Sequence, residues 1–173
     1  MLDWGGGIGQ HHELAKALLP EIRFDYHCFD VPAVAAEGDR SNPEVTFHSD
    51  GACLEDKYDL VVASGSLQYS EDWRQTLKAL ANATSDFLYI ARIPVVEKAK
   101  SFVVVQNAKR FGYPTPWQGW FFNRFEFLEV LAETDLCLDR EFLIDEQPFV
   151  PGAPEQAVYR AFRFTRKPPD HRP

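Results

Sequence analysis

Apolar and polar positions divide the chain into short segments that predict strands and helices in alternation. Runs such as 58–63, apolar at nearly every position, are typical of strands buried on both faces of a sheet. Apolar residues spaced three and four apart, as at 11–19, instead predict a helix, which ends at Pro20. The predicted strands are 1–4, 23–29, 45–48, 58–63, 87–93, 138–144 and 159–165. The predicted helices are 11–19, 32–37, one that begins after Ser70 and one that begins after Asn123.

Two of these helices carry capping signals. Ser70 is the predicted N-cap of the third helix, because Glu71 and Asp72 behind it suit the positive end of the helix dipole. Asn123 and Glu126 have the spacing of a capping box at the start of the fourth.

Strands and helices in alternation predict an α/β fold, a sandwich around a mainly parallel sheet. The 173 residues suffice for one domain with a sizeable core. We expect this domain to span 1–166 and the tail 167–173 to be flexible. The first strand is expected to be short, because only four residues at about 3.3 Å each precede a glycine-rich segment. A truncated gene product would explain so short a start.

The stretch between Pro94 and Asn123 does not fit the alternation, and we treat 95–122 as an aromatic insertion. Its aromatic residues are Phe102, Phe111, Tyr113, Trp117, Trp120, Phe121 and Phe122. A long insertion in a small domain is often functional. Two interpretations stay open: a lid or substrate pocket over the carboxyl ends of the strands, and a secondary hydrophobic cluster that covers the sheet.

Composition narrows the classes of partner. Lys and Arg number 18 against 26 Asp and Glu, a net charge of −8, which argues against a broad nucleic-acid surface. We expect no membrane span, because no apolar run approaches the ~20 residues that a spanning helix needs. The three cysteines, Cys28, Cys53 and Cys137, form no CxxC pair and are expected to be small buried apolar residues. Together with the lack of a visible signal peptide, they favour a cytoplasmic protein.

The segment that indicates chemistry is 3–10, DWGGGIGQ, between the first strand and the first helix. Glycines at alternate positions allow a tight bend that a ligand can approach closely, and the free N–H groups of the next helix point at the same place. A dinucleotide fingerprint would need a third glycine where Gln10 stands, which argues against a nicotinamide-dependent oxidoreductase.

An acidic residue followed by glycines at alternate positions resembles motif I of class I S-adenosylmethionine-dependent methyltransferases. The resemblance implies a Rossmann-like sheet of seven strands in the order 3-2-1-4-5-7-6, with the last strand antiparallel and helices on both faces. It also implies S-adenosylmethionine as cofactor, with Asp30 on its ribose and Asp50 and Gly51 near its adenine. The cofactor-binding residues that it implies are Asp3, Gly5, Gly6, Gly7, Gly9, Asp30, Val31, Asp50, Gly51, Ser64 and Gly65.

Together with segments 67–73 (LQYSEDW) and 92–95 (RIPV), the glycine segment is similar to a bacterial methyltransferase family associated with surface-polysaccharide or glycan biosynthesis. This resemblance implies transfer of a methyl group to a small molecule, a sugar or a glycan precursor. The form of transfer that it implies is O-methylation. A catalytically silent methyltransferase-like binding domain is the alternative. The oligomeric state stays open.

Several residues keep a plainer interpretation beside the functional one. Asp30 is also a candidate helix cap, Asp50 a loop residue, and Ser64 a turn residue. Arg92 suits either an anionic substrate group or a salt bridge. His11 and His12 are expected to be solvent-facing or half-buried on the first helix. No histidine, cysteine and carboxylate spacing resembles a metal site.

No single residue declares itself as the base that would take a proton from a hydroxyl acceptor. The candidates are Tyr69, Asp72, His48 and Tyr113. The candidate substrate-binding residues are Arg92, Tyr113 and Trp117.

Overall fold

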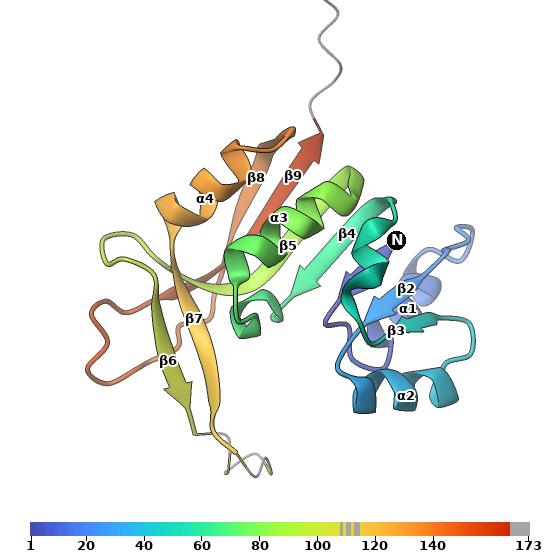
Figure 1. Cartoon of the computed structure of the whole chain (residues 1–173), viewed down its shortest axis with the longest axis horizontal. Helices are drawn as coiled ribbons and strands as arrows, with labels where there is room; N and C mark the ends of the chain where they lie inside the picture. The colour runs from blue at the N-terminus through green and yellow to red at the C-terminus, as the bar shows by residue number, and fades with distance from the viewer. Residues whose placement is uncertain (108, 110–111, 113–114, 167–173) are drawn as a thin grey trace, which may run out of the picture.

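One mixed β-sheet runs through the centre of the molecule, with helices on both of its faces (Figure 1). The structure is a computed structural model and describes residues 1–107, 109, 112 and 115–166. The strands are β1 (Leu2–Trp4), β2 (His27–Phe29), β3 (Thr46–His48), β4 (Tyr58–Ser64), β5 (Thr84–Val96), β6 (Phe102–Gln106), β7 (Trp117–Asn123), β8 (Leu136–Ile144) and β9 (Val158–Arg166). The helices are α1 (Gln10–Leu18), α2 (Pro32–Ser41), α3 (Trp73–Ala83) and α4 (Arg124–Ala132), with 3-10 turns η1 (Gly51–Glu55) and η2 (Leu67–Tyr69).

The strand order confirms the predicted topology. β3, β2, β1, β4 and β5 are parallel neighbours in that order. β9 then pairs antiparallel with β5, and β8 pairs with β9. Since β8 and β9 are the strands predicted as sixth and seventh, the order is the expected 3-2-1-4-5-7-6 with an antiparallel last strand.

The aromatic insertion adds a β-hairpin that the sequence did not predict. β6 and β7 pair antiparallel, from Phe102 opposite Phe121 to Gln106 opposite Trp117. The hairpin joins the sheet where Val95 of β5 pairs with Phe122. β9 already occupies one edge of β5 at Val95, so β7 takes the edge that β4 leaves free when it ends at Ser64. The described part of the sheet therefore has nine strands and not seven.

The two faces of the sheet bury different sets of side chains. On one face, η1, α3 and α4 cover the main core, whose largest fully buried side chains include Trp73, Phe122 and Phe127. On the other face, α1 and α2 lie against a smaller cluster around Tyr26, Cys28 and Val45 (Figure 1). The hairpin carries a third cluster, in which Val96, Val104 and Phe121 are buried.

Some element boundaries differ from the predicted ones for identifiable reasons. Asp72, and not Ser70, caps α3: its carboxylate accepts hydrogen bonds from the N–H groups of Arg74 and Gln75, whereas the Ser70 N–H closes η2. Helix α2 continues to Ser41 and packs Gly38 against the Phe47 ring. Only glycine allows this contact, because a Cβ atom at position 38 would lie 2.3 Å from the ring. β5 is longer than 87–93 because it has neighbours on both edges.

Three predictions about exposure or extent also change. Strand β2 begins only at His27, although the strand pattern starts at residue 23. Cys28 and Cys53 are buried as expected, but Cys137 is exposed on β8. His12 is buried although we expected it to be solvent-facing or half-buried, whereas His11 is half-exposed as expected. The predicted flexible tail, 167–173, lies outside the described residues.

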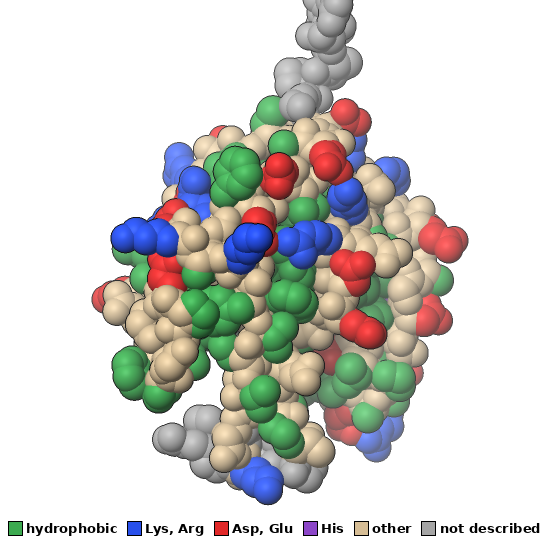
Figure 2. All heavy atoms as spheres, turned by 60° about the vertical axis from the view of Figure 1, so that its left-hand side comes forward, with side chains coloured by type: hydrophobic (Ala, Val, Ile, Leu, Met, Phe, Trp, Pro, Cys, Tyr) green, Lys and Arg blue, Asp and Glu red, His purple; other side chains and the backbone are tan. Residues whose placement is uncertain are grey.

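The surface agrees with the charge argument where it can be seen. On the face drawn in Figure 2, basic and acidic side chains are interspersed over the upper part, and apolar side chains gather below them. Within the described part of the chain, no helix is both long and apolar enough to span a bilayer.

Asn123 holds the junction between β7 and α4. Its side-chain oxygen accepts a hydrogen bond from the Glu126 N–H at 3.0 Å, which confirms the predicted cap. Its amide nitrogen donates to the Ala99 carbonyl at 2.8 Å and so ties the loop after β5 to the helix. The second half of a capping box is replaced by an ion pair, because the Glu126 carboxylate contacts Arg74 at 2.8 Å.

We predict that Asn123→Ala lowers the free energy of unfolding by about 2–3 kcal/mol, the sum of a lost cap and a lost amide hydrogen bond. Asn123→Ser keeps an oxygen that can cap the helix and should lose only about half as much. Urea unfolding followed by tryptophan fluorescence measures both. Equal losses in the two variants would contradict the double role.

Candidate functional site

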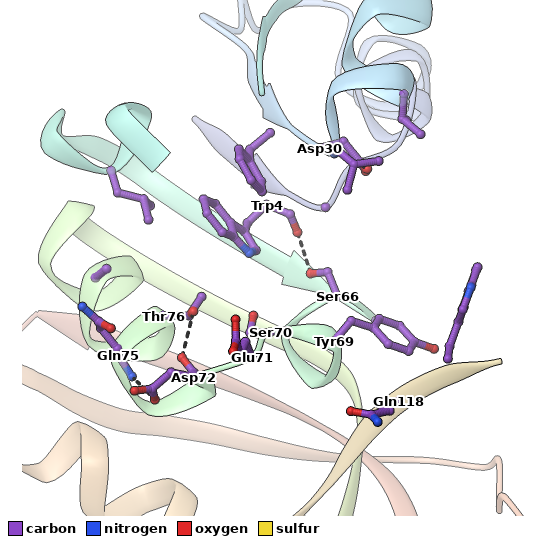
Figure 3. A pocket seen from close by; sticks show the side chains of 18 of the residues that line it. Trp4, Asp30, Ser66, Tyr69, Ser70, Glu71, Asp72, Gln75, Thr76 and Gln118 are labelled. Atoms are coloured by element: carbon purple, nitrogen blue, oxygen red, sulfur yellow. Dashed lines mark hydrogen bonds between the residues drawn. The ribbon is translucent and has the colours of Figure 1, made fainter. Parts of the chain in front are cut away.

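A cleft of about 1480 Å³ opens at the carboxyl ends of the parallel strands. Its walls come from the segment after β1, the end of β2, the segment after β4, the start of α3 and the start of β7. In Figure 3, Trp4 and Asp30 lie on one side of it, while Asp72, Gln75 and Thr76 lie on the opposite side. Open parallel sheets usually bind ligands at this edge.

The glycine-rich bend after β1 reaches the cleft through Gly5, whereas Gly6, Gly7 and Gly9 lie outside the cleft lining. Gly5 has a φ of 75°, and an added Cβ atom would lie 2.3 Å from the Ser66 Cβ atom, so only glycine fits there. Gly7 has a φ of 64° and faces more open space. Both glycines adopt the left-handed conformation that other residues avoid. The bend ends at Gly9, where α1 begins.

Asp30, which follows β2, is hydrogen-bonded to this bend. Its Oδ2 accepts a hydrogen bond from the Gly7 N–H at 2.9 Å, and its Oδ1 accepts one from the Val31 N–H at 2.8 Å. The alternative role as a cap of α2 is not realised, because Val31 is the N-cap residue and no side chain caps that helix. Each carboxylate oxygen keeps a further lone pair that can accept a hydrogen bond from a ligand in the cleft.

Asp3 lies beneath the bend and is 99% buried. Its Oδ2 accepts a hydrogen bond from the Tyr26 hydroxyl at 2.8 Å and lies 3.0 Å from His11 Nδ1. Its Oδ1 is buried and has no hydrogen-bond partner. Burial raises the pKa of the neighbouring Cys28 thiol to about 12, so this cysteine is protonated at neutral pH and a poor nucleophile.

Two aromatic rings beside the bend were not predicted as site residues. Trp4 and Phe29 are opposite each other on β1 and β2, and their rings stack with centroids 3.7 Å apart. Both line the cleft. The Ser66 hydroxyl donates to the Trp4 carbonyl at 2.6 Å, which joins the bend to the segment after β4 (Figure 3). The sequence signal that could have identified these two site residues is that each is the last residue of its predicted strand.

The wall opposite Asp30 combines η2, α3 and the hairpin. Tyr69 and Trp117 meet edge to face with ring centroids 5.7 Å apart, and both line the cleft with Gln118. The carboxylates of Glu71 and Asp72 line it as well. The described lining residues include three carboxylates and no lysine, arginine or histidine.

The structure brings some of the predicted residues to the cleft and leaves others outside its lining. Gly5, Asp30, Val31, Gly65, Tyr69, Asp72 and Trp117 line it. Asp50 caps η1 through the Ala52 N–H at 3.0 Å, and Gly51 begins that turn, from which Leu54 reaches the cleft. Ser64 ends β4 below the cleft without lining it.

Two predicted polar side chains have partners elsewhere. Arg92 forms a two-fold hydrogen-bonded salt bridge with Glu146, both contacts at 2.9 Å, which is the plainer of its two interpretations. His48 lies outside the cleft lining, and its Nε2 is 2.9 Å from His27 Nδ1. The pKa of His48 is lowered, mainly by burial and to a smaller extent by the charge of His27. Tyr113, a candidate for both catalysis and substrate binding, lies outside the described residues.

Comparisons with solved structures identify the fold. The chain superposes on a magnesium protoporphyrin IX methyltransferase of Synechocystis PCC 6803 with bound S-adenosylmethionine, with a TM-score of 0.63 and 14% identity over 96% of this chain and 69% of that one. An O-methyltransferase from a polyketide synthase multienzyme of Brevibacillus brevis, in complex with S-adenosylhomocysteine, gives a TM-score of 0.69 and 15% identity over 95% and 65% of the two chains. A methyltransferase of Methanosarcina mazei gives 0.63 and 13% over 95% and 91%.

The chain therefore shares the fold of these methyltransferases, as the sequence resemblance implied. No protein-family model matches the chain, and no curated protein sequence matches it.

We predict that the His11–Asp3 contact makes stability depend on pH. The hydrogen bond to Asp3 raises the pKa of His11 above its usual 6.5. A raised pKa in the folded state stabilises the fold fully below 6.5, and this stabilisation is lost as the pH rises through the folded-state pKa. The difference in unfolding free energy between the wild type and His11→Gln should therefore be largest in mild acid and shrink in mild alkali. Chemical denaturation across this range measures it, and a constant difference would contradict the contact.

Proposed function

We propose that this protein transfers a methyl group from S-adenosylmethionine to a small hydroxyl-bearing acceptor. The observation that carries the proposal is the contact between the Asp30 carboxylate, which lines the cleft, and the glycine bend, in which the Gly7 N–H donates to Oδ2 at 2.9 Å. A carboxylate fixed there can accept hydrogen bonds from both ribose hydroxyls, while the adjoining glycines leave room for the amino-acid end of the cofactor.

The residues present fit this cofactor. The orphaned Oδ1 of Asp3 suits an ammonium donor, which the cofactor's amino-acid end carries. Gly5, Gly6, Gly7 and Gly9 would hold that end, and Val31, Asp50, Gly51 and Leu54 would surround the adenine. Ser64 and Gly65 would lie beside the methionine chain. When bound, S-adenosylmethionine supplies a methyl group on a positively charged sulfur, which is already activated for transfer to a nucleophile.

The chain's own work is to orient an acceptor and exclude water. The hairpin residues Trp117 and Gln118 face the cleft across from the bend and would hold the acceptor against the η2 segment. Positioning of this kind supplies up to about 7–11 kcal/mol in model reactions. Of the four candidate bases, Tyr69 and Asp72 line the cleft, so one of these two side chains would take the proton of an acceptor hydroxyl.

The charge of the cleft favours an uncharged acceptor, such as a sugar, over an anionic one. Asp30, Glu71 and Asp72 line the cleft, and no basic side chain of the described residues does. A phosphorylated acceptor would meet like charge without a compensating cation, which costs affinity. We therefore propose O-methylation of an uncharged sugar-type compound. A glycan precursor would enter by its sugar end.

The free cysteines agree with a cytoplasmic location.

Isothermal titration calorimetry with S-adenosylhomocysteine tests the cofactor proposal. We expect saturable binding to the wild type and an affinity more than tenfold weaker for Asp30→Ala, because each hydrogen bond to a charged group contributes about 1.5–3 kcal/mol. Asp39→Ala, on the exposed face of α2, is the matched control and should bind like the wild type.

Thermal unfolding of both variants shows whether the fold persists, since Asp30 also accepts the Gly7 N–H. Absence of heat at millimolar ligand would refute the proposal. Binding of NADH in its place, followed by fluorescence, would assign the cleft to a nicotinamide cofactor.

We further predict that radiolabelled methyl transfer will favour neutral sugars over the same sugars bearing a phosphate. Glu71→Gln should narrow the difference, because it removes one negative charge from the acceptor side of the cleft. Equal rates for neutral and phosphorylated acceptors would rule out charge as the basis of selection.

A further inference from the structure

His12 is the most unusual side chain outside the cleft. It is 96% buried on α1, where its ring packs against Tyr26 with centroids 5.0 Å apart. Its Nδ1 is buried and has no hydrogen-bond partner. A buried polar atom without a partner destabilises the fold, and a bound ion is one of the recurring reasons for such an atom.

Two carboxylates stand next to this nitrogen. Glu13 Oε1, on the same helix, is 3.5 Å from His12 Nδ1. Glu44 comes from the connection between α2 and β3, and the three possible ligand atoms all lie within 4.8 Å of one another. This group could not be predicted from the sequence, because Glu44 is more than thirty positions from the other two residues and no metal-ligand spacing joins them.

A cation already occupies the space between the carboxylates. The Lys16 ammonium is hydrogen-bonded to Glu44 and lies 3.9 Å from Glu13 Oε1. The Lys16 ammonium balances one of the two negative charges. Its N–H groups could also donate a hydrogen bond to the lone pair of His12 Nδ1, but they make no such bond. The Lys16 contacts with the two glutamates account for the carboxylates but not for the imidazole nitrogen.

We propose that His12, Glu13 and Glu44 form a binding site for a divalent metal ion of the zinc type, which displaces the Lys16 ammonium. An imidazole nitrogen with two carboxylate oxygens is a donor set that zinc accepts, with one position left for water. The imidazole favours a transition metal over magnesium or calcium. Ligand atoms around a tetrahedral zinc ion are about 3.3 Å apart, so the surface side chains of Glu13 and Glu44 need only small adjustments.

The site would brace the glycine bend from behind. His12 donates its backbone N–H to the Gly9 carbonyl at 3.0 Å, at the point where the bend becomes α1. Asn42, two residues before Glu44, approaches the same carbonyl with its side-chain amide at 3.4 Å. A metal shared by His12 and Glu44 therefore fixes α1 to the connection that leads into β3. This role is structural and does not depend on the proposed methyl transfer.

Competitive titration tests the site: the full chain, without an affinity tag, is titrated with Zn²⁺ or Co²⁺ against a chelator of known affinity. We expect one saturable equivalent, and a visible Co²⁺ spectrum of the four-coordinate type. Glu44→Gln should weaken binding about tenfold or more, since it removes a charged ligand. Lys16→Met should tighten it, because the competing positive charge is gone.

Glu21→Gln, an exposed carboxylate elsewhere on the surface, is the control and should leave the affinity unchanged. Nitrogen NMR of the His12 ring gives a readout that needs no variant: Zn²⁺ should shift Nδ1, whereas Mg²⁺ should not. Absence of saturable binding at millimolar metal, equal affinities in all variants, or an unmoved Nδ1 signal would each overturn the proposal.

Discussion

The hydrogen bond between the Gly7 N–H and the Asp30 carboxylate joins the ends of two neighbouring parallel strands, and the shape of the cleft depends on it. Because Trp4 pairs with Phe29, β1 and β2 end side by side, and the segments that follow them must meet. The bend can close there only because Gly5 lacks a Cβ atom that would meet Ser66. A carboxylate with unused lone pairs is thus held at one side of an open cleft, where it can accept hydrogen bonds from the hydroxyl groups of a ligand.

The length of β5 is a second constraint, because it decides what faces the bend. β5 continues past the end of β4, and β9 occupies its other edge, so β7 pairs on the side of the bend. The hairpin thereby contributes both to a hydrophobic cluster and to the lining of the cleft. Phe121 and Val104 form a hydrophobic cluster, while Trp117 and Gln118 line the cleft.

Local and topological features were predictable from the sequence, whereas contacts between distant segments were not. The glycine bend and the Asn123 cap follow from short sequence patterns, whereas the strand order followed from the resemblance to methyltransferases. The hairpin was missed because its strands pair across a long connection. Ser70 was preferred to Asp72 as a cap because η2, which uses the Ser70 N–H, has no sequence signal. The burial of His12 depends on Tyr26, from another element.

The central claim is that the Asp30 carboxylate beside the glycine bend holds the ribose of an adenosyl cofactor. A crystal structure of the protein soaked with S-adenosylhomocysteine tests it most directly. The account predicts electron density in the cleft, with both ribose hydroxyls within hydrogen-bonding distance of Asp30 and the amino-acid end against Gly5 and Gly7. Density for the ligand elsewhere, or a ribose turned away from Asp30, would contradict it.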